Sequence, residues 1–319
     1  MKMNTTEAYK KIYSIRKAEE IIAEYYYNNK IFSFVHFYIG QEAVAVGVCE
    51  NLTSDDRLFG NHRSHGHYLA KGGDLVAMYS EMLGKASGCC RGKGGSMHML
   101  DRSVGFMGST PILASAVPIA AGSALNQKLS KSNNITAVFY GDGASEEGIV
   151  YETMNLAATL SLPLLMVLED NLYSVCTPHE DRRSKDYGID KIAGGFGVKF
   201  IKANGNDFLN VYEAANAAIK YVKEMRAPCV LYCQVFRHMA HSAPIRDDKN
   251  GYRKIDTEEV RRKEDSLLKL RANVVSQYGE EEIIEIERHI DLKVSEALNK
   301  AVSSPEPNAN EMMIGVYHE

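Results

Sequence analysis

The feature that most constrains the fold is the alternation of short apolar runs with helical stretches through the middle of the chain. Two segments between the runs, 147–162 and 211–225, have apolar residues at helical spacing. Strands that alternate with helices predict crossover connections and a mostly parallel sheet. Continuous apolar strands predict a sheet that is covered on both faces. The runs are ITAVFY (135–140), PLLMVLED (163–170), VKFIKA (198–203) and PCVLYCQVF (228–236).

The two ends of the chain have a different, helical pattern. Residues 7–27 carry apolar side chains every three or four positions, with Asn4 and Thr6 as candidate N-caps, and a second helix is expected near Gln41. After about residue 255 the chain is rich in charges at helical spacing. We therefore expect one domain over residues 1–319, with residues 255–319 as its helical C-terminal extension.

Composition excludes several classes of protein. The 37 Lys and Arg residues nearly balance the 41 Asp and Glu residues, which argues against a nucleic-acid partner. No apolar run approaches the roughly 20 residues of a membrane-spanning helix, and the charged N-terminus lacks the apolar core of a secretory signal. We expect a cytoplasmic protein with no membrane partner. The six cysteines include no C-x-x-C pair and are interpreted as reduced thiols, with a redox or zinc role second.

A glycine-rich turn follows the first of the central apolar runs. Gly141-Asp142-Gly143-Ala144 stands between a predicted strand and a predicted helix. Glycines let backbone N–H groups approach a phosphate, and the N-terminus of the next helix favours negative charge. An Asp in such a turn would repel a phosphate unless a divalent cation lay between them.

The next strand supports this cation. It ends at Asn171, which is 29 residues after Asp142 (171 − 142), and one strand–helix–strand crossover needs about 30 residues. The two side chains should therefore emerge side by side at one edge of the sheet. Carboxylate, amide and carbonyl oxygens suit Mg²⁺, which takes its remaining ligands from phosphates and water.

These segments resemble one family. GDGASEEG, followed by NLAATLSLPLLMVLEDNLY, resembles the thiamine diphosphate motif. The blocks HFYIGQEAVAVG, HRSHGHYLAKG, GKGGSMHM and RHMAHS resemble the alpha subunits of the decarboxylating component of 2-oxo acid dehydrogenase complexes, a group that includes the acetoin dehydrogenase alpha subunit. The resemblance covers about residues 10–260. It implies an α/β, thiamine diphosphate-binding fold: a mostly parallel sheet flanked by helices, with helical N- and C-terminal extensions.

The resemblance also implies the ligands of a metal ion and a diphosphate. Asp142 and Asn171 would bind Mg²⁺ through their side chains, and Tyr173 through its carbonyl. Gly143 and Ala144 would offer backbone donors to the diphosphate. The pair that grips the diphosphate would be His62 and Arg63, since Arg can bind it bidentately.

Further residues are implied around the reacting end of the cofactor. His241 would lie near the diphosphate and act in catalysis with His65, and both His65 and His36 would stand near the mouth of the site. Ile112 and Leu113 would pack under the thiazolium and contact the aminopyrimidine. His98, His179, His289 and His318 are interpreted as structural or surface residues.

The implied enzyme is incomplete as a single chain. In the family, the Glu beside the aminopyrimidine comes from a beta subunit, so the resemblance implies an alpha2beta2 heterotetramer. The implied reaction is decarboxylation of a 2-oxo acid and transfer of the acyl unit to a lipoyl group on an acyltransferase. The alternatives are an acetoin or acyloin dehydrogenase alpha subunit, a stand-alone thiamine diphosphate enzyme without a lipoyl partner, and a degenerate binding protein without turnover.

Two departures from the family pattern leave the substrate open. GSTPILASAVP (108–118) replaces a glycine-rich stretch, and Pro111 removes a backbone donor there. Ser145-Glu146-Glu147 replaces the more usual small or amide residues.

Overall fold

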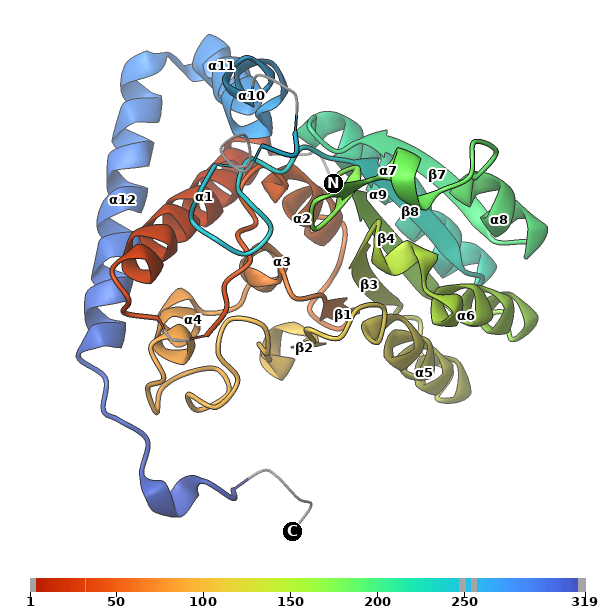
Figure 1. The fold of residues 1–319 in the computed structure, drawn as a ribbon, viewed down its shortest axis with the longest axis horizontal. Coiled ribbons are helices and arrows are strands. Elements are labelled where there is room, and N and C mark those ends of the chain that lie inside the picture. Colours follow the sequence, from red (N-terminus) through yellow and green to blue (C-terminus); the bar gives the residue numbers. More distant parts are fainter. Residues whose placement is uncertain (1–3, 32, 247–250, 254–256, 315–319) are drawn as a thin grey trace.

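The computed structural model describes residues 4–31, 33–246, 251–253 and 257–314, and it contains a six-stranded parallel sheet (Figure 1). The strand order is β2-β1-β3-β4-β8-β7, and every neighbouring pair is parallel. This agrees with the predicted α/β class. The strands are β1 (Arg57–Gly60), β2 (Phe106–Ser109), β3 (Thr136–Gly141), β4 (Leu164–Asp170), β7 (Lys199–Asn204) and β8 (Cys229–Gln234).

Helices cover both faces of this sheet. Alternate residues of β3 and β4 enter two different apolar clusters: Phe139 and Val167 face one, whereas Val138 and Met166 face the other. The first cluster includes residues of α1 (Thr5–Tyr27), α2 (Glu42–Cys49) and α9 (Phe208–Met225), and the second includes residues of α5 (Ala116–Leu129), α6 (Gly148–Thr159) and α8 (Ile189–Gly195). The fully buried strands explain why the apolar runs were continuous.

The N-terminal helix begins as its cap predicts. The Asn4 side chain accepts hydrogen bonds from the backbone N–H groups of Thr6 and Glu7, so α1 starts at Thr5. The remaining helices are α3 (His65–Ala70), α4 (Leu75–Met82), α7 (His179–Arg182), α10 (Thr257–Glu264), α11 (Ser266–Tyr278) and α12 (Glu280–Val302). A short hairpin of β5 (Tyr173–Ser174) and β6 (Thr177–Pro178) precedes α7.

The C-terminal helices pack against the N-terminal ones. The α12 helix runs alongside α1 and contacts α4, and α11 contacts α1 and α2 (Figure 1). A buried ion pair joins them: Arg16 of α1 binds Glu42 of α2 at 2.5 Å and Asp265, the N-cap of α11, at 2.9 Å. That residues 255–319 extend a single domain stays a prediction, and residues 255, 256 and 315–319 lie outside the described residues.

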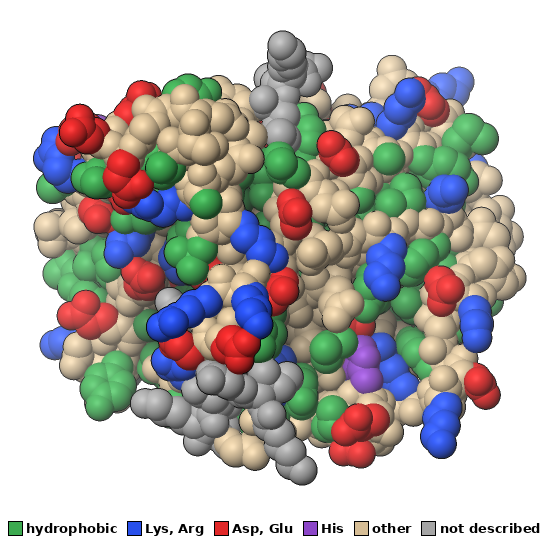
Figure 2. Space-filling view, turned by 90° about the horizontal axis from the view of Figure 1, so that it is seen from above, with side chains coloured by type: hydrophobic (Ala, Val, Ile, Leu, Met, Phe, Trp, Pro, Cys, Tyr) green, Lys and Arg blue, Asp and Glu red, His purple; other side chains and the backbone are tan. Residues whose placement is uncertain are grey.

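The surface carries charges of both signs. Figure 2 shows acidic and basic side chains interspersed over one face, which fits the net charge of −4. Within the described residues, no helix combines the length and apolarity needed to cross a membrane.

Candidate active site

The carboxyl ends of the two central strands open into a cavity of about 190 Å³. β3 and β4 pair in register with Gly141 opposite Glu169, so the residues that follow each strand emerge together. Asp142 and Asn171 both line this cavity, as their spacing predicted. All ten residues predicted to bind the cofactor lie in its wall: His62, Arg63, Ile112, Leu113, Asp142, Gly143, Ala144, Asn171, Tyr173 and His241.

Asp142 is nearly buried and is held by two cationic side chains of α7. Arg182 donates from Nη2 to Asp142 Oδ2 at 2.5 Å, and His179 Nε2 lies 3.3 Å from the same oxygen. Burial alone would raise the pKa of Asp142, but its hydrogen bonds with His179 and Arg182 keep it below its usual value. Asp142 is therefore a carboxylate whose counter-charge comes from the chain itself.

The same helix neutralises two further acids beside Asp142. His179 Nε2 lies 3.0 Å from Asp170 Oδ1, Arg182 Nη1 donates to Glu146 at 2.5 Å, and Arg183 also binds Glu146. Burial would lower the pKa of His179, but Asp142 and Asp170 raise it to about 8. Three cationic and three anionic side chains thus balance at the end of β3 and β4.

The turn after β4 is strained and braced from behind. Leu172, between Asn171 and Tyr173, has φ of 72°, in the left-handed region that a non-glycine residue rarely occupies. Its N–H donates to Asp170 Oδ1 at 2.8 Å. Arg253 donates to the Asn171 carbonyl at 3.0 Å and stacks on the Tyr173 ring at 4.4 Å. These contacts fix the two predicted metal ligands on the cavity wall.

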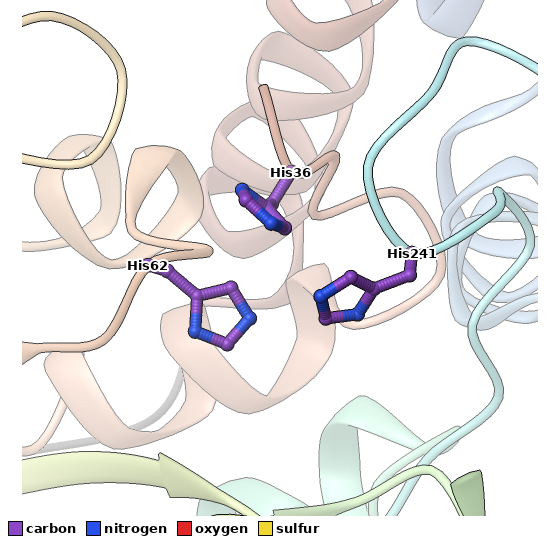
Figure 3. A group of neighbouring side chains, drawn as sticks. All are labelled: His36, His62 and His241. Atoms are coloured by element: carbon purple, nitrogen blue, oxygen red, sulfur yellow. The ribbon is translucent and has the colours of Figure 1, made fainter. Parts of the chain in front are cut away.

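Three histidines of the cavity wall face one another (Figure 3). The ring centroids of His36 lie 4.6 Å from His62 and 4.9 Å from His241. Burial, followed by the charge of Arg63, lowers the pKa of His36 and His241 to about 3 and that of His62 well below its usual value. All three imidazoles are therefore neutral at pH 7.

Arg63 ties this histidine cluster together. Its guanidinium is buried and donates to the Phe37 carbonyl at 2.5 Å and to the His241 carbonyl at 3.2 Å. It therefore joins the backbone next to His36 with the backbone of His241. Arg63 also lines the wall of the cavity.

His65, the second predicted catalytic residue, lies elsewhere. It is fully buried, and its two ring nitrogens lie 2.8 Å from Glu19 and 2.8 Å from Ser96. It is not among the cavity-lining residues described, although Met97, the neighbour of Ser96, is. The geometry favours a positioning role for His65, and its catalytic role stays a prediction.

The apolar part of the wall comes from the segment before α5. Ile112 is 70% exposed and Leu113 is 46% exposed, yet both line the cavity. Pro111 lies beside them in the wall, so the departure from the family pattern falls on the cavity surface. Two exposed apolar side chains at a cavity rim are typical of a surface that another group covers.

Several residues at this site were missed from the sequence. His179, Arg182 and Arg183 bind the metal-ligand candidate or its neighbours, and Arg253 braces the turn after β4. One signal was present in the sequence, the unusual Glu146, which the structure pairs with Arg182 and Arg183.

Comparisons with known proteins identify the family of this chain. The profile of the family described as "Dehydrogenase E1 component" matches residues 10–310. The alpha subunit of acetoin:2,6-dichlorophenolindophenol oxidoreductase from Cupriavidus necator is 37% identical over 313 residues, covering 97% of this chain and 92% of that protein. Its Bacillus subtilis counterpart is 34% identical, with 97% and 92% covered. The pyruvate dehydrogenase E1 component subunit alpha of Rickettsia bellii is 33% identical, with 98% and 95% covered.

The chain therefore belongs to the dehydrogenase E1 component family, whose members are thiamine diphosphate-dependent oxidoreductases. The family resemblance and the enzyme class predicted from the sequence are confirmed.

The residues present fit this cofactor. Asp142 and Asn171 supply hard oxygen ligands, and Arg63 supplies a positive charge on the same cavity. A Cβ at Gly143 would lie 2.6 Å from Ser174 Oγ, so Ser174 can pack this closely against the turn only because the residue is glycine. Carboxylate, amide, bare backbone and guanidinium together are the groups that a metal-bound diphosphate requires.

Proposed function

We propose that this chain is the alpha subunit of a thiamine diphosphate- and Mg²⁺-dependent 2-oxo acid dehydrogenase that works with a beta subunit. One observation carries the proposal. Asp142 and Asn171, from the ends of adjacent parallel strands, face the same cavity as Arg63 and three neutral histidines. Both acetoin and pyruvate relatives bear the name of alpha subunits, which implies a beta partner.

The metal and the diphosphate would be held by different parts of the wall. Asp142, Asn171 and the Tyr173 carbonyl would hold Mg²⁺, after Asp142 exchanges its bond with Arg182. The backbone N–H groups of Gly143 and Ala144 would donate to the diphosphate. When bound, the cofactor would supply the nucleophilic carbon and the electron sink that protein side chains lack.

The histidine cluster would bind the diphosphate and handle protons. His62 and Arg63 would grip the diphosphate, Arg63 as a fixed charge. His241 would accept or return a proton near the substrate once the negative charge of a bound diphosphate raises its pKa towards neutrality, where an imidazole is an effective acid–base group. His65 would position this region through Ser96, which lies 2.8 Å from its Nε2.

The cavity needs a second chain. Among the described residues of the wall the carboxylate is Asp142, which already faces the metal position. We infer that the carboxylate that activates the aminopyrimidine comes from a partner, as the family resemblance implies, and the exposed Ile112 and Leu113 would lie under the cofactor where that partner covers it. We propose an alpha2beta2 heterotetramer in the cytoplasm, with a lipoyl acyltransferase as acceptor of the acyl unit.

Acetoin is the second candidate substrate. The observation that favours it is the pair of acetoin relatives, at 37% and 34% identity and with 92% of each covered by this chain. Pro111 in the cavity wall also marks the substrate end as different from the family pattern.

Co-expression with the beta subunit tests the proposal. The complex, supplied with thiamine diphosphate and Mg²⁺, should reduce dichlorophenolindophenol with a 2-oxo acid and release carbon dioxide. Reduction with acetoin but with no 2-oxo acid would select the second candidate. Asp142→Ala should abolish Mg²⁺-dependent cofactor binding in calorimetry, and Asp190→Ala on the distant helix α8 should leave it unchanged. Unaltered binding in Asp142→Ala would refute the metal assignment.

A further inference from the structure

Away from the cavity, two adjacent thiols and a carboxylate meet in the loop that follows α4. Cys89, Cys90 and Glu81 each offer one ligand atom, and these atoms lie within 4.8 Å of one another. Both cysteines are free and partly exposed. The proposed function does not use them, so the site stands apart from the cofactor cavity.

Glu81 gives this loop a fixed shape. Its Oε2 accepts the N–H groups of Cys90 and Gly92 at 2.7 and 2.9 Å, and its Oε1 accepts those of Gly94 and Gly95 at 2.6 and 3.1 Å. Each oxygen already accepts two hydrogen bonds. Glu81 therefore holds the backbone that carries the thiols and is not free to bind a metal ion.

The two thiols are chemically unequal. Hydrogen bonding from Cys89 lowers the pKa of Cys90, whereas the pKa of Cys89 is raised. The pair thus combines one activated sulfur with a second sulfur in immediate reach.

The number of sulfur atoms that this loop offers decides which kind of metal or metalloid can bind. Zinc needs four ligands, and only two sulfurs are offered once Glu81 is committed to the backbone. A monosubstituted trivalent arsenical has two positions open to thiolates and prefers soft sulfur to oxygen. We propose that Cys89 and Cys90 form a dithiol site for monosubstituted trivalent arsenicals.

The binding step balances without an oxidant. An arsenical oxide, R–As=O, forms two As–S bonds with Cys89 and Cys90, and two S–H bonds break. Both protons leave with the oxygen as water, and arsenic stays trivalent. The bond from the Cys90 thiol to the His98 carbonyl, 3.0 Å long, is given up when the thiol loses its proton.

Phenylarsine oxide is the probe, applied to the full chain. Mass spectrometry should find one adduct that bridges residues 89 and 90. It should resist an excess of β-mercaptoethanol and be removed by 2,3-dimercaptopropanol, because a second thiol on the same chain acts at an effective concentration in the millimolar range. Cys89→Ser and Cys90→Ser should each lose the mercaptoethanol-resistant adduct, and thermal denaturation should verify that each variant is folded.

Cys176 supplies the matched control. It is exposed and belongs to no such group among the described residues, so Cys176→Ser should keep the adduct in full. Three outcomes would each overturn the proposal: no resistant adduct on the wild-type chain, an adduct on Cys176, or an adduct that survives in either folded single-serine variant. The other cysteines, which are buried, are Cys49, Cys229 and Cys233.

Discussion

Arg182 should compete with a metal ion for Asp142, and replacing it should tighten metal binding. Its Nη2 lies 2.5 Å from Asp142 Oδ2, and its side chain is only 11% exposed, so water screens the contact weakly. A hydrogen bond between charged groups contributes about 1.5–3 kcal/mol net. A divalent ion that takes this oxygen must replace that bond. Arg182→Gln should therefore raise metal affinity about tenfold to a hundredfold, at 1.4 kcal/mol per factor of ten.

Manganese titration measures this effect directly. Mn²⁺ accepts the same oxygen ligands as Mg²⁺, and its free concentration is read from its electron paramagnetic resonance signal. The titration is performed with saturating thiamine diphosphate and the beta subunit. Arg182→Lys keeps the charge and should stay close to wild type. Equal or weaker Mn²⁺ affinity in Arg182→Gln would refute the competition, because removing a competitor of the metal ion should raise the affinity for that ion.

Three further predictions concern stability. Arg16→Met leaves Glu42 and Asp265 without their buried partner and should lower the free energy of unfolding in urea by about 3–5 kcal/mol. Lys17→Met removes an exposed ion pair and should change it by less than about 1 kcal/mol. Similar losses in the two variants would contradict the role of the buried network. Burial would raise the pKa of Asp56, but hydrogen bonds from Lys223 and two backbone N–H groups hold it below the ordinary value of 3.8. The stability that ionised Asp56 contributes is therefore complete above pH 3.8 and is lost as the pH falls through the lower pKa of the folded state. Asp56→Asn should make the free energy of unfolding less dependent on pH in this acid range, and an unchanged pH dependence would contradict the assignment. Gly66→Ala places a Cβ 2.0 Å from the Tyr38 ring and should lower the melting temperature. Gly122→Ala places a Cβ with no atom within 4 Å and should raise the free energy of unfolding by up to about 1 kcal/mol, because alanine favours a helix more than glycine does. The reverse order of stability would refute the packing argument.

The central strands were predictable because their signal is local. Continuous apolar runs marked β3, β4, β7 and β8, and the 29-residue spacing placed Asp142 and Asn171 at one edge. β1 and β2 were not predicted, since four residues each are too short to show a period. β2 lies at the sheet edge and β1 lies between β2 and β3, and both places follow from tertiary pairing alone.

The cationic helix α7 was missed for a different reason. His179, Arg182 and Arg183 stand in a run of mixed charges that is typical of a solvent-exposed surface. Their partner Asp142 is 40 residues from Arg182, so only the folded chain brings them together. His65 shows the converse: the family resemblance placed it near the mouth of the site, whereas the structure buries it against Glu19.

The C-terminal helices reach the cavity through one chain of contacts. Asp265 binds Arg16, Arg16 binds Glu42, and Glu42 accepts the N–H of Gly40 at 2.9 Å, three residues from the Phe37 carbonyl that Arg63 grips. A chain truncated before α11 would lack Asp265 and would leave the buried Arg16 guanidinium with Glu42 as its remaining partner from this ion-pair network. The C-terminal helices thus stabilise a pocket whose wall, within the described residues, includes none of their side chains.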